Sequence, residues 1–447
     1  MIKEDNIAAI STAMQPSGVA IIRISGSSPL DIAKKMFHTK SADVYDFEPY
    51  KLYVGAIDAG SFKDFGMCVY FKAPKSYTGE DMVEFHCHGG QAITKGILET
   101  CLNNGARLAE RGEFTKRAFL NGKLSLSSCE GLIDMINSQS VAEAKAGYYL
   151  YRENLFKRIK KDQDDLTYVL ALIDANIDYP EEDIEQAELD DIKNRLIIVK
   201  NDILKLSDSY KTGSKAYGGV SVCLCGKPNV GKSSVLNAIL RCDKAIVTAV
   251  EGTTRDLVEG TVEIEGVRFN FFDTAGIRES DNTVEKLGIE RSKKAIETAD
   301  VVVFIADGSA DFTESDEEVY NLVKDKNLIK VLNKSDERRA SSFTDYDFVI
   351  SAKTGEGIDD LKKAIYDKSG LEFFNFDGDY LVERRHYEAL ISAVKALEKS
   401  ISELENQPLD VITIDIRDAL ISLGLISGET ADENVINEIF SKFCVGK

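Results

Sequence analysis

The stretch Gly226–Ser234 (GKPNVGKSS) decides the fold of the middle of this chain. It fits the pattern GxxxxGK(S/T), and it follows an apolar run at 220–225 and precedes a helical pattern, which is the context of a phosphate-binding loop. In such a loop, backbone N–H groups surround phosphates and the helix N-terminus favours their negative charge. Lys232 would then neutralise the β- and γ-phosphate oxygens, and the Ser233 hydroxyl would bind Mg²⁺.

Around this loop, apolar strands alternate with helical stretches, which predicts a doubly wound, mostly parallel α/β sheet. The predicted strands are 220–225, 269–272, 300–306, 328–332 and 348–351. Before them, short strands and a helix at 90–103 predict an N-terminal α+β domain. Long amphipathic helices follow at 128–147, 147–177 and 192–210, and the sequence is helical again from residue 380.

We therefore expect an α/β nucleotide domain inserted between two helical halves that pack together as one bundle. The polar, glycine-bearing segment 211–219 is expected to be a linker. The predicted domains are 1–117 (α+β), 118–215 (first helical half), 216–370 (Ras-like G domain) and 371–447 (second helical half).

Bulk composition excludes several classes of protein. At 447 residues the chain is too long for one core. Its formal charge of −20 argues against a general nucleic-acid-coating protein, although RNA could still meet one local basic face or a partner. No apolar run approaches the roughly 20 residues that cross a bilayer. We expect a cytoplasmic protein whose eight scattered cysteines stay reduced.

Further motifs in the same order predict that the nucleotide is GTP. Asp273-Thr-Ala-Gly276 ends one strand, where an Asp can hold Mg²⁺ through water and a glycine N–H can sense the γ-phosphate. Asp336, in Asn333-Lys-Ser-Asp336, can accept two hydrogen bonds from guanine, whereas adenine lacks the 2-amino donor. The expected GTP-binding residues are Asn229, Val230, Gly231, Lys232, Ser233, Ser234, Thr248, Ala249, Val250, Glu251, Gly252, Thr253, Thr254, Asp273, Thr274, Ala275, Gly276, Asn333, Lys334, Asp336, Ser351, Ala352 and Lys353.

The hydrolysis machinery departs from the Ras pattern. Ile277 stands where Ras-like proteins place a water-orienting Gln, and an isoleucine cannot hydrogen-bond water. Asn229, inside the phosphate-binding loop, offers an uncharged oxygen that could hold a monovalent cation near the phosphates. The alternative is that Asn229, after Pro228, is a turn-forming residue.

Several motifs outside the nucleotide domain resemble those of the MnmE (TrmE) family of tRNA-modification GTPases. They are GVAIIRISG (18–26), YTGEDMVEFHCHGG (77–90), RGEFTKRAFLNGKLSL (111–126), IDYPEE (177–182) and the terminal CVGK (444–447). The resemblance covers the whole chain. It implies a homodimer joined through N-terminal domains that bind a tetrahydrofolate, as the 5-formyl or 5,10-methylene derivative. It also implies G domains that associate in a K⁺-dependent way, and an FAD-containing partner, MnmG.

Together such proteins add an aminomethyl or carboxymethylaminomethyl group to position 5 of the wobble uridine in certain tRNAs. The resemblance implies site residues as well. They are Asn229, Thr248, Val250 and Thr253 for K⁺, Ser233 and Thr254 for Mg²⁺, Arg23, Glu80, Lys123 and Lys447 for folate, and Lys232, Glu285 and Cys444 for catalysis. Glu285 would orient the attacking water, and Cys444 would be catalytic or structural near the folate. The alternative is a regulatory or ribosome-assembly GTPase that binds RNA without helping to modify it.

Overall fold

A computed structural model describes residues 5–178, 186–242, 260–273, 295–337, 344–372, 374–375 and 380–447. The chain forms two compact units. The first comprises residues 1–133, 150–182 and 407–447, and the second comprises residues 134–149 and 183–406. No helix in the described ranges is long and apolar enough to cross a membrane.

The N-terminal part of the first unit is an α+β domain, as predicted. Its sheet has the order β3-β4-β5-β6-β2-β1-β7, and neighbours are antiparallel except β1 and β7. The strands are β1 (Asn6–Ile10), β2 (Ala20–Gly26), β3 (Phe37–His38), β4 (Leu52–Asp58), β5 (Lys63–Phe71), β6 (Asp81–Cys87) and β7 (Ala106–Leu108). Helices α1 (Pro29–Met36) and α2 (Gln91–Asn103) supply Ile32, Met36 and Ile97 to the core on one sheet face.

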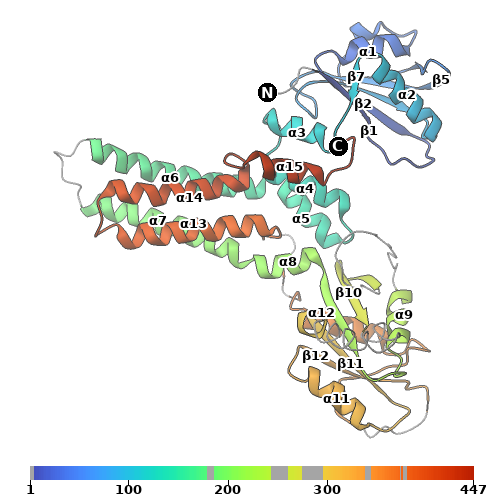
Figure 1. Cartoon of the computed structure of the whole chain (residues 1–447), viewed down its shortest axis with the longest axis vertical. Helices are drawn as coiled ribbons and strands as arrows, with labels where there is room; N and C mark the ends of the chain where they lie inside the picture. Colours follow the sequence, from blue (N-terminus) through green and yellow to red (C-terminus); the bar gives the residue numbers. More distant parts are fainter. Residues whose placement is uncertain are drawn as a thin grey trace, which may run out of the picture. The chain divides into compact units, whose positions relative to one another are not determined.

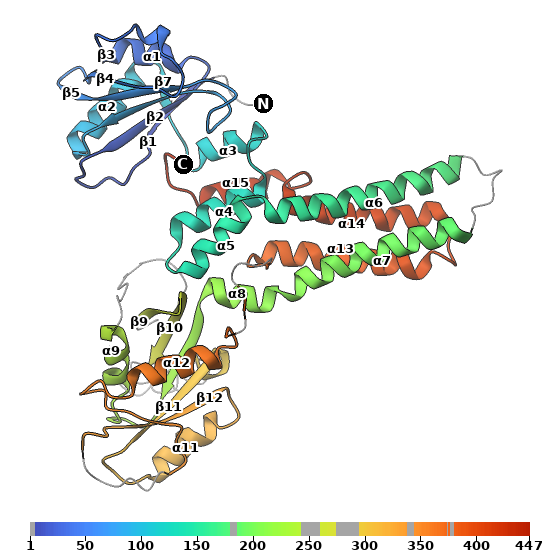
Figure 2. The same ribbon diagram turned by 180° about the vertical axis from the view of Figure 1, so that it is seen from behind.

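The two helical halves of the sequence pair with each other. Helix α14 (Leu409–Ser427) packs along α6 (Asn154–Asp178), and α13 (Arg384–Glu403) packs along α7 (Gln186–Asp208) (Figures 1 and 2). In each pair, one helix precedes the nucleotide domain in sequence and the other follows it. The remaining helices of these halves are α3 (Glu113–Leu120), α4 (Leu126–Asn137), α5 (Val141–Tyr151), α8 (Tyr210–Gly218) and α15 (Glu433–Ser441).

Three sequence-based expectations for this region are wrong. The helix expected at 147–177 is divided between α5, which ends at Tyr151, and α6, which begins at Asn154, because Glu153 between them has a left-handed φ of +62°. The single helix at 128–147 is divided into α4 and α5, because Ser140 and Glu143 start a new helix. The Glu143 N–H donates to Ser140 Oγ (3.2 Å), and the Glu143 carboxylate accepts from the Gln139 N–H (2.6 Å). The expected linker at 211–219 is helix α8. Gly213 lets this helix touch the 380–381 backbone, since a Cβ there would lie 2.1 Å from the Leu381 carbonyl oxygen.

The second unit contains the predicted doubly wound sheet, with the order β13-β12-β11-β8-β10-β9. Among the described strands of this sheet, β9 and β10 are antiparallel neighbours and the other neighbouring pairs are parallel. The strands are β8 (Val220–Cys225), β9 (Gly260–Ile264), β10 (Val267–Asp273), β11 (Val301–Asp307), β12 (Leu328–Asn333) and β13 (Phe348–Val349). Helices α9 (Lys232–Cys242) and α12 (Ile358–Lys368) pack with one face, and α11 (Glu314–Val323) packs with the other.

Burial on both faces explains why β8 and β11 are continuous apolar runs. Their parallel arrangement brings the carboxyl ends of β8, β10, β11 and β12 to one edge of the sheet, where ligands bind in such folds.

Asp300 fastens the start of β11 to its neighbours. Its carboxylate accepts hydrogen bonds from the Ser221 N–H (3.0 Å) and Oγ (2.8 Å), and it pairs with Lys215 Nζ at 2.7 Å. Burial alone would raise the pKa of Asp300. The Lys215 and Ser221 hydrogen bonds outweigh that effect and lower the pKa below its usual value. Asp300 is therefore held in its ionised form in the folded protein.

Candidate functional site

The loop between β8 and α9 has the backbone that a phosphate-binding loop needs. Gly226 has φ +150°, and a Cβ there would lie 2.3 Å from the Ile305 carbonyl oxygen, so only glycine fits beside β11. Asn229 has φ +66°, a left-handed conformation that asparagine tolerates better than most residues, and its side chain is exposed. The turn requirement alone therefore accounts for an asparagine at this position, and exposure leaves its side chain accessible to a cation.

Lys232 and Ser233 occupy the first turn of α9. Lys232 is 5% exposed, and its ammonium donates to the carbonyl oxygens of Gly226 (2.9 Å) and Lys227 (3.1 Å), so it lies folded over the loop. Ser233 Oγ donates to Asp273 Oδ2 at 2.9 Å across the gap between α9 and the end of β10. The structure thus brings together a hydroxyl and a carboxylate of the kinds that hold Mg²⁺ beside nucleotide phosphates.

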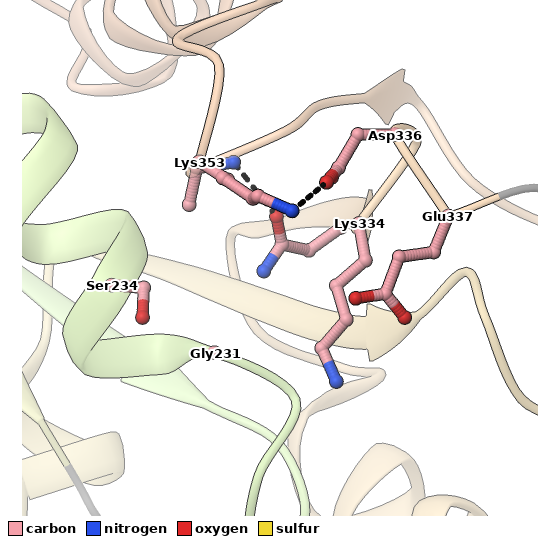
Figure 3. Close-up of a pocket in the computed structure, with 8 residues that line it drawn as sticks. Gly231, Ser234, Lys334, Asp336, Glu337 and Lys353 are labelled. Atoms are coloured by element: carbon pink, nitrogen blue, oxygen red, sulfur yellow. Dashed lines mark hydrogen bonds and ion pairs between the residues drawn. The ribbon is translucent and has the colours of Figure 1, made fainter.

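A pocket at the ends of β12 and β13 contains the residues expected to recognise the base (Figure 3). Asp336 Oδ1 accepts a hydrogen bond from Ser351 Oγ (2.7 Å), and Asp336 Oδ2 lies 3.3 Å from Lys353 Nζ. The Ser351 hydrogen bond and the Lys353 ammonium hold the pKa of Asp336 below its usual value. The pocket is lined by Gly231, Ser234, Asn333, Lys334, Asp336, Glu337, Ala352 and Lys353.

Asn333 ties this base pocket to the phosphate-binding loop. Its Nδ2 donates to the Val230 carbonyl oxygen (2.8 Å), and its Oδ1 accepts from the Ala352 N–H (3.1 Å). Lys334 Nζ pairs with Asp307 Oδ2 at 2.7 Å, which joins the ends of β12 and β11. The phosphate-binding loop, the end of β12 and the segment after β13 are therefore held together around one cavity.

Sequence reasoning missed an anchor of the phosphate-binding loop. Lys227 Nζ pairs at 2.6 Å with Asp316 Oδ2 in the first turn of α11, and Asp316 is 1% exposed. The same carboxylate oxygen accepts from the Thr313 N–H (2.9 Å) and Oγ1 (2.8 Å), which completes a capping box. The Thr313-x-x-Asp316 spacing was visible in the sequence, but its pairing with a residue 89 positions away was not.

Several expected site residues lie outside the described residues. They are Thr248, Ala249, Val250, Glu251, Gly252, Thr253, Thr254, Thr274, Ala275, Gly276 and Glu285, together with Ile277. Among the expected GTP-binding residues, the described ones are those of the phosphate-binding loop, Asp273 and the base pocket.

The residues expected to bind folate lie in the N-terminal domain and next to it. Arg23, on β2, pairs through Nε with Glu84 Oε1 (2.7 Å), and its guanidinium lies over the rings of Tyr77 and Phe114 at 5.2 and 5.6 Å from their centroids. Burial alone would raise the pKa of Glu84. Hydrogen bonds and charge from His86 and Arg23 outweigh it and lower the pKa, so Glu84 is an ionised partner for Arg23.

Glu80 is held by two polar neighbours. Its Oε2 accepts from Ser25 Oγ (2.7 Å), and its Oε1 accepts from Arg117 Nη1 (3.1 Å). Arg117 is 4% exposed and also pairs with Asp5 (2.6 Å) and Glu113 (3.0 Å). A carboxylate has about four acceptor positions, so Glu80 keeps the capacity to accept further hydrogen bonds. The positioning residues Ser25 and Arg117 were not identified from the sequence.

Lys123 and the chain terminus approach this domain from two directions. Lys123 Nζ donates to the Pro74 carbonyl oxygen (3.1 Å), and its side chain lies beside Gly79, next to Glu80 in the chain. The terminal segment docks on the domain, since Val445 bridges to Arg111 and Gly446 packs against the Ile10 carbonyl.

The docked terminus positions the last expected residues. Lys447 is partly exposed, and Cys444 is the exposed member of the seven free cysteines in the described part of the chain. Glu80 accepts a hydrogen bond from Ser25, which lies two residues after Arg23 on β2. No contact in the described structure links Lys447 to Arg23 or Glu80.

Comparisons with known proteins cover the full length of the chain. The model of the MnmE helical domain matches residues 126–444, and that of the GTP-binding protein TrmE N-terminus matches residues 6–123. The chain is 40% identical to the tRNA modification GTPase MnmE of Thermoanaerobacter pseudethanolicus, with 99% of each chain covered. It is 38% and 39% identical to the proteins of that name from Acetivibrio thermocellus and Clostridioides difficile, with 100% of each chain covered.

A solved structure of Aquifex aeolicus Era bound to GDP·AlF₄⁻ aligns with 39% of this chain and 66% of that one, at 30% identity and a TM-score of 0.27. Motifs in every part of the chain, the inserted nucleotide domain and the full-length relatives agree with one another. The chain therefore belongs to the MnmE (TrmE) family of tRNA modification GTPases.

Proposed function

We propose that this protein binds and hydrolyses GTP and that hydrolysis serves the modification of tRNA. The observation that supports this most directly is the placement of two sites on one sheet edge. The Ser233–Asp273 pair lies at the N-terminus of α9, and the Asp336 pocket lies at the end of β12, with Asn333 joining the two. The relatives named tRNA modification GTPase MnmE match over their whole length.

The chain's own residues divide the work of holding the nucleotide. Lys232 exchanges its loop carbonyl partners for β- and γ-phosphate oxygens, and the α9 N-terminus adds favourable backbone N–H groups. Ser233 and Thr254 would hold Mg²⁺, which supplies positive charge to the phosphate oxygens. Asp336 accepts the N1–H and 2-amino hydrogens of guanine. Glu285 orients the attacking water, the task that Ile277 cannot perform.

We further propose that K⁺ binds near the phosphates and that two G domains meet there in a homodimer. Asn229 would contribute its side-chain oxygen, and Thr248, Val250 and Thr253 would complete the cation shell. The exposed side chain of the left-handed Asn229 is accessible for this role. GTP turnover measured in KCl and in NaCl at equal ionic strength tests the proposal. We expect faster turnover in KCl, and equal rates would contradict it.

We propose that the N-terminal domain, residues 1–117, binds a tetrahydrofolate derivative. Glu80 has acceptor capacity for the pterin N–H groups, and the partly exposed Tyr77 ring beside Arg23 offers apolar surface for a flat ring system. Arg23, Lys123 and Lys447 would hold the anionic tail, with Cys444 near the reacting carbon.

Titration of the purified chain with 5-formyltetrahydrofolate tests this folate site. Saturable binding that weakens in Glu80→Gln supports it. Absence of saturable binding to the unaltered chain would instead favour an assembly GTPase that does not modify RNA.

The remaining proposal concerns the reaction itself. With an FAD-containing MnmG partner in the cytoplasm, the protein would add an aminomethyl or carboxymethylaminomethyl group to position 5 of the wobble uridine. The folate would supply the one-carbon unit. The family of the chain supports this assignment, and the wobble nucleosides of cells lacking the protein test it.

A further inference from the structure

The turn before helix α6 and the first eight residues of that helix carry a local positive charge that contrasts with the rest of the chain. The ten residues 152–161 (RENLFKRIKK) hold five basic side chains and one acidic side chain, whereas the whole chain has a net charge of −20. No other ten-residue window of the sequence has so large an excess of basic residues. A concentration of this kind calls for a physical explanation.

Helix stability does not explain it. The N-terminus of a helix carries partial positive charge, so acids are favourable in its first turns and bases in its last turns. In α6, Lys157 lies in the first turn, whereas Lys160 and Lys161 lie in the second turn, beyond the range of this effect, and Asp162, Asp164 and Asp165 follow them directly. The helix dipole therefore gives no reason for a basic cluster at these positions.

These lysines form one exposed stripe. Positions 157, 160 and 161 are spaced i, i+3 and i+4, which places them on one side of the helix. The opposite side is buried by Leu155 and Ile159, and α6 packs there along α14. We call this stripe of Lys157, Lys160 and Lys161 the basic α6 face.

In the described part of the chain, two exposed carboxylates lie near the basic α6 face: Glu429, and Asp164, which is four residues after Lys160 on the same side of the helix. Lys160 Nζ lies 3.5 Å from Glu429 Oε1, but both side chains are about half exposed (46% and 48%), so water and salt screen the pair. Lys157 Nζ donates to the Arg152 carbonyl oxygen at 3.5 Å, a contact that leaves its charge in place. No ion pair within the described residues involves Lys157 or Lys161.

We propose that the basic α6 face binds the phosphate backbone of the RNA substrate, an inference that rests on the proposed function in tRNA modification. Exposed lysines act as point charges for phosphates, and the adjacent positive end of the helix adds to the same field. The contact is independent of base sequence and positions the RNA. An acidic protein surface is the competing occupant.

The test compares tRNA binding by the unaltered full-length chain and by Lys157→Gln/Lys160→Gln/Lys161→Gln over a range of salt concentrations. Each phosphate contact contributes roughly 0.7–0.9 to the slope of log K against log salt, so loss of three contacts lowers the slope by about 2–3. The triple variant should therefore bind tRNA roughly 100-fold more weakly than the unaltered chain at 0.1 M salt, and the two affinities should become equal near 1 M salt.

A matched control removes the same charge elsewhere. It replaces three exposed lysines elsewhere in the chain with glutamine, namely Lys326, Lys363 and Lys395. The control should keep the original slope, and both variants should keep GTP turnover. The α6 variant should melt at about the same temperature as the unaltered chain, because the three lysines are exposed and the Lys160–Glu429 pair is screened by water and salt.

Unchanged affinity and slope in the α6 variant, or an equal loss in the control, would overturn the assignment. So would a variant that keeps RNA binding but loses wobble modification in cells, since the face would then meet a protein. An unaltered chain that binds no tRNA also overturns it. GTP turnover and the wobble nucleosides, measured on the unaltered chain, test the proposed function separately.

Discussion

Replacement of Asp336 by Asn changes the chemistry of the base pocket while preserving its shape. The carboxylate is fixed by Ser351 Oγ at 2.7 Å and faces the pocket beside Lys353 (Figure 3). In the proposed complex it accepts hydrogen bonds from both the N1–H and the 2-amino group of guanine. An asparagine side chain can accept only one of them, and its own N–H₂ group opposes the second donor.

The size of the effect follows from the hydrogen bonds that are lost. A hydrogen bond to a charged group contributes about 1.5–3 kcal/mol, and the second guanine donor is also left without a partner. A loss of about 3 kcal/mol corresponds to roughly 100-fold weaker GTP binding. Xanthine carries a carbonyl oxygen where guanine carries the 2-amino group. The side-chain amide of the Asp336→Asn variant can donate to that oxygen, so binding of xanthosine triphosphate should improve.

The assay is competitive binding of GTP and xanthosine triphosphate to the unaltered chain and to Asp336→Asn. The matched control is Glu337→Gln, which removes one negative charge from the wall of the same pocket. We expect the control to retain the preference for GTP. An Asp336→Asn variant that binds GTP within about three-fold of the original affinity, with no gain for the xanthine nucleotide, would refute the role assigned to Asp336.

Three further predictions concern contacts that hold the sites in place. Lys227→Met leaves the buried Asp316 without its partner and should destabilise the G domain by about 3 kcal/mol in urea unfolding, whereas Lys227→Arg should not. Asp300→Asn should be less stable than the original chain at pH 7. Because the pKa of Asp300 is lowered in the folded protein, its ionised carboxylate stabilises the fold at pH 7, and this contribution is lost as the pH falls below 3.8 through the folded pKa. The difference in the free energy of unfolding between the two proteins should therefore disappear in acid. A difference that persists there would contradict this. Gly446 has φ +99°, and Gly446→Ala would place a Cβ 2.2 Å from the Ile10 carbonyl oxygen, so this variant should release the chain terminus to carboxypeptidase. The control is Gly105→Ala, because Gly105 also has a positive φ (+113°) but has open space around it. Equal digestion rates of the two variants would count against docking of the terminus.

The strands of the G domain could be predicted because burial on two faces leaves a direct mark on composition. The run at 220–225 is β8 at the predicted bounds, and the polar motifs beginning at Gly226 and ending at Asp336 follow strand ends, as the fold requires. The order and spacing of the motifs were therefore enough to predict that Asn333 and the phosphate-binding loop lie at one cavity.

Features that depend on contacts between distant segments could not be predicted. The break between α4 and α5 is different, because the sequence does indicate it: residues 137–140 (NSQS) are all polar, and Ser140-x-x-Glu143 has the spacing of a capping box. Helix α8 forms in a glycine-bearing polar segment because Gly213 permits close packing against residues 380–381. Likewise, Arg117 became recognisable only when the fold placed Glu80 and Asp5 beside it.

The most direct test of the central claim is the wobble-uridine content of tRNA from cells that lack this protein, measured by mass spectrometry of nucleosides. We expect loss of the 5-substituted wobble uridines, restored by the unaltered gene and not by Asp336→Asn under normal nucleotide pools. Unchanged wobble nucleosides in the deleted cells would contradict a role in tRNA modification.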